Sequence, residues 1–101
     1  MNTTKEDIKE IATVNTSIIY YKRKNSRTDH IESVEVEASK FNLQTSIDLL
    51  INTFKIKKDL IKSISTTKGT KSNERGFYIS KFCLNDIKYL TREEVKTVLN
   101  N

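Results

Sequence analysis

The pattern of apolar and polar positions predicts a hairpin in the first forty residues. Residues 17–21 are β-branched and aromatic, and residues 33–38 alternate between apolar and polar with a period of two. The polar and basic residues 22–29 lie between these two strands and predict a turn. Residues 3–12 start with hydroxyl and acidic side chains and carry apolar residues at helical spacing, so they predict a short N-terminal helix.

The period changes to a helical one in the middle of the chain, with Asn42 or Thr45 available as the N-cap. The apolar positions of this first segment are Leu43, Ile47, Leu50, Ile51 and Phe54. After a brief interruption, residues 57–64 resume the pattern with Leu60, Ile61 and Ile64 on one side. The two segments predict a pair of short helices.

The last third of the chain predicts a loop, a strand and a helix. Residues 65–76 contain no apolar side chain and include both glycines, Gly69 and Gly76, which indicates an exposed loop or hairpin tip. Residues 77–83 have strand composition, and residues 91–94 read Thr-Arg-Glu-Glu, a capping box that opens a final helix. No interdomain linker interrupts the 101 residues, so we expect one domain over 1–101.

Residues 47–64 are similar to a helix-turn-helix, in which apolar residues close the first helix, occupy the turn and anchor the second helix. The residues at those positions are Phe54, Ile56, Leu60, Ile61 and Ile64. Lys55 replaces the usual turn glycine and Ile51 is larger than the usual crossing residue, so an ordinary helical hairpin on a sheet stays open as the alternative. A basic tip and a strand after the second helix favour the winged version. The predicted fold is therefore α+β: a winged helix-turn-helix with a small antiparallel sheet and flanking N- and C-terminal helices.

The charge is segregated along the chain. Lysine and arginine outnumber aspartate and glutamate by 18 to 13, for a net charge of +5 and a pI near 9.4. Residues 55–81 alone carry a net +6, whereas residues 30–41 are rich in glutamate. Such segregation favours a polyanionic partner, and the predicted partner is double-stranded DNA.

The candidate DNA-binding residues fall into three groups. We expect the lysines of the second helix to hold phosphates. We expect the wing, an element suited to a narrow A/T-rich minor groove, to contribute more to specificity than the helix does. The arginines of the first hairpin turn either grip a neighbouring phosphate stretch or belong to a solvated turn. The second-helix residues are Lys57, Lys58 and Lys62, and the wing residues are Lys68, Lys71, Asn73 and Arg75. The arginines of the hairpin turn are Arg23 and Arg27.

Catalysis, metal binding and membrane insertion find no support in the sequence. There is no phosphate-binding glycine loop, no pair of metal carboxylates and no nucleophile motif, so we expect neither an enzyme nor a cofactor. Cys83 and His30 are single and far apart, and we expect Cys83 to be a small buried hydrophobe. Without an apolar span or signal-peptide core, the predicted location is the cytoplasm. The hydrophobic fraction of 36% suits a homodimer in which a second subunit covers apolar surface.

Over its full length the chain resembles the TcpK-like origin-of-transfer accessory proteins, small winged-helix proteins of Gram-positive conjugative plasmids. The resemblance rests on size, basicity, the two-helix unit 47–64 and the wing 68–76. It implies a protein that binds duplex DNA near the origin of transfer and assists a relaxase in relaxosome assembly. Two alternatives stay open: a transcriptional repressor of the same or of ribbon-helix-helix fold, with residues 33–38 in the groove, and a protein-binding phage or plasmid inhibitor module.

Overall fold

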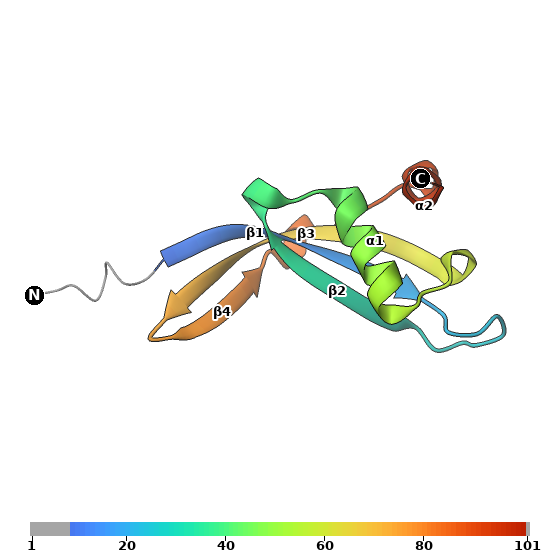
Figure 1. The fold of residues 1–101 in the computed structure, drawn as a ribbon, viewed down its shortest axis with the longest axis horizontal. Coiled ribbons are helices and arrows are strands. Elements are labelled where there is room, and N and C mark those ends of the chain that lie inside the picture. Colours follow the sequence, from blue (N-terminus) through green and yellow to red (C-terminus); the bar gives the residue numbers. More distant parts are fainter. Residues whose placement is uncertain (1–8, 101) are drawn as a thin grey trace, which may run out of the picture.

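The computed structural model describes residues 9–100, which form an α+β fold with a five-stranded antiparallel sheet and two α-helices (Figure 1). Along the sheet the order is β2-β1-β3-β4, and β5 pairs with β3 beyond the end of β4. Single 3-10 turns lie at Ala38–Lys40, Lys58–Leu60 and Leu84–Asp86. The elements are β1 (Lys9–Tyr20), β2 (His30–Glu37), α1 (Leu43–Phe54), β3 (Ile61–Glu74), β4 (Phe77–Phe82), β5 (Lys88–Tyr89) and α2 (Arg92–Leu99).

Two long strands, β1 and β3, form the centre of the sheet and give it two distinct ends. Their pairing runs from Lys9↔Asn73 to Tyr20↔Ile61. Strand β2 lies along the half of β1 that ends at Tyr20, and β4 lies along the opposite half of β3. We call the end with the β1–β2 and α1–β3 connections the loop end, and the end with the β3–β4 turn the hairpin end (Figure 1).

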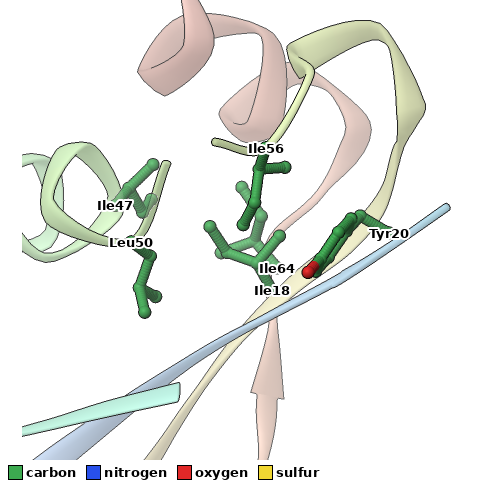
Figure 2. Packing of buried hydrophobic residues seen from close by; sticks show 6 residues of the cluster. All are labelled: Ile18, Tyr20, Ile47, Leu50, Ile56 and Ile64. Carbon is green, nitrogen blue, oxygen red and sulfur yellow. The ribbon is translucent and has the colours of Figure 1, made fainter. Parts of the chain in front are cut away.

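Helix α1 covers one face of the sheet, and the hydrophobic core lies between them. Strand residues alternate between faces, so Ile18, Tyr20 and Ile64 point toward the helix side. Figure 2 shows them meeting Ile47 and Leu50 of α1 and Ile56 from the segment after it. Residues on α2 add partly buried contacts to this core. The opposite side of the sheet carries alternate residues such as Asn15, Ser17 and Ile19, and we call it the open face because no helix within residues 9–100 lies on it.

The boundaries of α1 follow from local chemistry. The Asn42 side chain accepts a hydrogen bond from the Thr45 N–H at 2.9 Å, which satisfies one of the free amides of the first turn. The helix ends at Lys55, whose φ of 56° and ψ of 45° are left-handed, the conformation that glycine takes at a helix C-terminus. This turn directs Ile56 back into the core, where it is 5% exposed.

The sheet curls toward its open face at the hairpin end. The Glu35 carboxylate on β2 accepts hydrogen bonds from Thr13 at 2.7 Å and from Ser80 on β4 at 2.8 Å, although β1 and β3 separate those strands. Close packing also explains Gly69, because a Cβ there would lie 2.6 Å from the Lys81 carbonyl oxygen and 2.8 Å from a Phe82 ring carbon. The two edges of the sheet therefore approach each other over the open face.

Several sequence predictions are confirmed. The strands predicted at residues 17–21 and 33–38 overlap the ends of β1 and β2, the strand predicted at 77–83 coincides with β4 to within one residue, and the first helix begins after Asn42. The capping box is also present: the Thr91 N–H donates to Glu94 Oε1 at 2.9 Å, and the Glu94 N–H donates to Thr91 Oγ1 at 3.1 Å. Each of these features depends on residues close together in the chain.

The predicted second helix of the helix-turn-helix is wrong. Residues Lys58–Leu60 form one 3-10 turn, and Ile61 already begins β3, because strand pairing with β1 satisfies the backbone that a helix would otherwise satisfy internally. Phe54 is 44% exposed instead of closing a helix pair. The winged helix-turn-helix is therefore not confirmed. Strand β2 pairs with β1 and is followed by a single α-helix, which differs from a ribbon-helix-helix arrangement.

Two further expectations need correction. Of the N-terminal helix predicted over residues 3–12, residues 3–8 lie outside the described residues, and Lys9 to Ala12 belong to β1. The predicted loop 65–76 is mostly strand β3, with only Arg75 and Gly76 forming the turn, since its hydroxyl residues pair with β1 on one side and with β4 and β5 on the other. Within residues 9–100, no helix has the length and apolarity needed to cross a bilayer.

Candidate nucleic-acid interface

The loop end brings together two basic segments that are distant in the sequence. A hydrogen bond from the Tyr21 N–H to the Leu60 carbonyl oxygen, at 3.0 Å, holds the start of the β1–β2 loop against the α1–β3 connection. A shallow depression of about 210 Å³ lies between them, with Lys22 contributed by the first segment and Lys55 and Lys57 by the second. Three lysines thus surround one concave spot.

Exposed cations cover this end of the molecule, and we call them the basic loop end. They are Lys22, Arg23, Lys24, Arg27, Lys55, Lys57 and Lys58. The Lys58 Nζ donates to the Leu99 carbonyl oxygen at 2.9 Å, which joins the loop end to the last turn of α2. None of the seven takes part in either ion pair found among the described residues. Six of them are thus open to solvent and to an anionic ligand.

Lys62, one of the predicted DNA-binding residues, is paired with a carboxylate. Its Nζ lies 3.1 Å from Asp29 Oδ1 and 5.1 Å from the centroid of the Tyr21 ring. The hydrogen bond to Asp29 is the main reason that the pKa of Lys62 is raised, followed by the contact with Tyr21. Because Asp29 balances its charge, Lys62 connects the β1–β2 loop to β3 and is not one of the open cations.

The hairpin end holds the other predicted group in a mixed arrangement. Arg75 lies in the turn with a φ of 54° and is exposed, and Lys68 is exposed on β3. Lys71 lies over the Tyr78 ring, 5.0 Å from its centroid. Asn73 is half-buried, and its Oδ1 has no hydrogen-bond partner among the described residues. Only Lys68 and Arg75 of the four project freely.

The nine predicted residues therefore form two groups instead of one surface. Arg23, Arg27, Lys57, Lys58 and Lys62 lie at the loop end; Lys68, Lys71, Asn73 and Arg75 lie toward the hairpin end. The β1 residues at the two ends, Tyr20 and Lys9, are eleven positions apart, or about 36 Å along an extended strand. The predicted site does not include Lys22, Lys24 and Lys55, although all three adjoin or lie within its basic segments.

Metal-ligating side chains do not gather anywhere in residues 9–100: no three His, Cys, Asp or Glu side chains are placed to hold a metal ion. The His30 ring lies near the Tyr20 ring in a tilted arrangement, with the ring centroids 5.7 Å apart and the planes at 36°. Cys83 is exposed, so the expectation of a buried cysteine is wrong; it follows β4 at the edge of the sheet, where no element of the described chain covers it.

Comparison with known proteins finds no matching family model, no significantly similar curated protein and no significantly similar solved structure.

Proposed function

We propose that this protein is a non-enzymatic, sequence-selective binder of double-stranded DNA, with the basic loop end as its main contact. The observation that carries the proposal is the convergence of six open cations, from two segments of the chain, on one end of the molecule. Lysine and arginine there would neutralise phosphates and release condensed counterions, which is the dominant sequence-independent term in DNA affinity. Arg23 and Arg27 also offer planar donors that suit guanine edges.

The β3–β4 hairpin supplies a second contact and takes the role that a wing has in the winged fold. Its tip is narrow and presents Arg75, a residue suited to a minor groove. The two contacts lie beyond opposite ends of β1, whose extended length is about 36 Å, so together they span at least one turn of B-DNA, roughly 34–36 Å. A molecule lying along the duplex would therefore contact the DNA at two separate places.

The resemblance to origin-of-transfer accessory proteins now rests on size, basicity and the basic hairpin tip, since residues 47–64 do not form two helices, and it suggests where such a site lies and what it serves. In this proposal the DNA is near a plasmid origin of transfer, the protein acts in the cytoplasm, and it assists a relaxase. A homodimer would present two basic loop ends and so address two half-sites.

Binding to duplex DNA across a salt series tests the proposal. Fluorescence anisotropy with specific and random duplexes should give an affinity that falls steeply with salt. The triple variant R23A/K24A/R27A should reduce the slope of log K against log salt by about 2.7, or about 0.9 for each phosphate that is no longer neutralised. The matched control K40A/K88A/K96A removes the same charge from exposed positions outside the basic loop end and should leave the slope close to that of the wild type.

Three results would decide against specific parts of this proposal. Equal losses in the two triple variants would show that net charge, and not the loop end, governs binding. Absence of binding at every salt concentration would favour a protein-binding module instead. Protection of a promoter, with none at an origin of transfer, in a footprint of plasmid DNA would favour a repressor.

A further inference from the structure

We propose that the open face at the loop end is the surface through which two copies of this chain pair. This inference rests on the homodimer of the proposed function but not on DNA binding. A shallow depression of about 230 Å³ lies on this face, between β2 on one side and the β4–β5 edge on the other. Its rims carry large apolar side chains that no element of the described chain covers.

The exposed apolar area is the first argument for a partner. Leu84 is 74% exposed, Tyr89 62% and Ile31 61%, and Phe82 and Ile87 are more than a third exposed. Together the five present on the order of 500 Å² of surface, near the upper limit for the largest apolar patch on a monomeric protein. With the polar floor added, the patch approaches the roughly 800 Å² that each subunit buries in a standard interface.

The floor of the depression can be desolvated by a partner at low cost. None of the described residues that line it is charged. The Asn15 Nδ2 donates to Ser17 Oγ at 3.2 Å, and the hydroxyls of Ser17 and Ser33 are 2.8 Å apart, so these polar groups are partly satisfied within the subunit. Burying them under a partner costs less than burying unpaired groups.

The absence of cations from this lining argues against nucleic acid as the occupant, even though Phe82 and Tyr89 are aromatic. Single-stranded nucleic acid needs a positive groove beside its stacking platforms. Lys71, a cation on the open face, lies over Tyr78 in the other half of the sheet. An uncharged protein surface fits the patch better.

The two rims are complementary to each other, which points to a second copy. Ile19 and Ile31 form the β2-side rim, and Leu84, Ile87 and Tyr89 form the opposite one. A two-fold axis parallel to the strands, between two facing sheets, would place each β2-side rim over the partner's β4–β5 rim. The same axis would bring both basic loop ends to one end of the dimer.

Charge-swap variants test this arrangement by sedimentation velocity. The wild type should be a dimer, and I31E or L84K alone should raise the dimer dissociation constant by roughly 30-fold or more. An equimolar mixture of the two variants should form a heterodimer. In it the carboxylate introduced at position 31 of one subunit faces the ammonium introduced at position 84 of the other, and the second pair of rims keeps its apolar residues. Both positions are exposed in the single chain, so urea unfolding should confirm that each variant is folded.

The matched control is L49E, which changes an exposed apolar residue on α1, away from the open face. It should leave the dimer intact. A wild type that stays monomeric at high-micromolar concentration would overturn the proposal. I31E or L84K that stays dimeric by itself would also overturn it, as would an equimolar mixture of the two that stays monomeric. Salt-dependent DNA binding by such a monomer would leave the proposed function standing, so the two failures are distinguishable.

Discussion

The β3–β4 turn contains a residue whose backbone conformation opposes its side chain. Glu74 and Phe77 are paired, so Arg75 and Gly76 form a two-residue hairpin loop, and their φ values of 54° and 85° are both positive. This is the pattern of a type I′ turn, which matches the twist of the flanking strands and favours Asn-Gly. Arginine in the left-handed region costs about 1–2 kcal/mol relative to the right-handed one.

We expect R75N to raise the free energy of unfolding by about 0.5–1 kcal/mol, because asparagine tolerates this conformation with its side chain bonded locally. For a domain of this size that corresponds to about 2–6 °C in Tm. R75G should be close to neutral, since relief of the steric cost is offset by about 0.4–1 kcal/mol of added conformational freedom in the unfolded chain. R75A keeps a Cβ and should stay within about 0.5 kcal/mol of the wild type.

Urea unfolding of the four proteins measures this order, with similar m-values confirming that the native and unfolded states are comparable. All three variants lose the same cation, so each should reduce the salt slope of DNA binding by about 0.9 if Arg75 contacts a phosphate. If R75N is no more stable than R75A, the left-handed turn is not the source of the cost and the reasoning is refuted.

Two other predictions concern the core. I64A should lower the free energy of unfolding by about 2–4 kcal/mol, because Ile64 is fully buried. The control L49A, at a half-exposed site, should lower it by under about 1 kcal/mol. Equal losses in the two variants would contradict the assignment of the core. Burial, followed by the charge and hydrogen bond of Glu32, raises the pKa of Tyr20 above its usual 10.0. The native state therefore keeps the Tyr20 proton to a higher pH than the unfolded chain does. Stability is consequently lost as the pH rises above about 10. Y20F should remove that part of the alkaline loss in pH-dependent unfolding, leaving the part due to Lys62, whose pKa is also raised; an unchanged alkaline limb would argue against it.

Local signals were sufficient for the elements whose ends are set by neighbouring residues. The Asn42 cap and the Thr91 capping box act over three positions, and both helices start where the sequence predicts. In the sequence Lys55 counts against a turn because it replaces the usual glycine, yet it occupies the left-handed position that ends α1. The strand after this turn was not predictable from the same signals, because its apolar spacing also fits a helix.

The sequence by itself determined the α+β composition, the cap positions and the amount of positive charge, because these depend on residue type and near neighbours. The tertiary structure alone decided that residues 61–74 form a strand, because their hydrogen-bond partners come from β1 and β4. Hydroxyl residues of this strand, such as Ser65 and Thr67, are buried although they are not apolar, so hydrophobicity does not mark them as a strand. It also decided which cations are neighbours: folding places Lys22 beside Lys55 and Lys57, and the length of β1 separates them from Arg75. Distances between residues far apart in the chain depend on sheet pairing, which periodicity along a single segment does not encode.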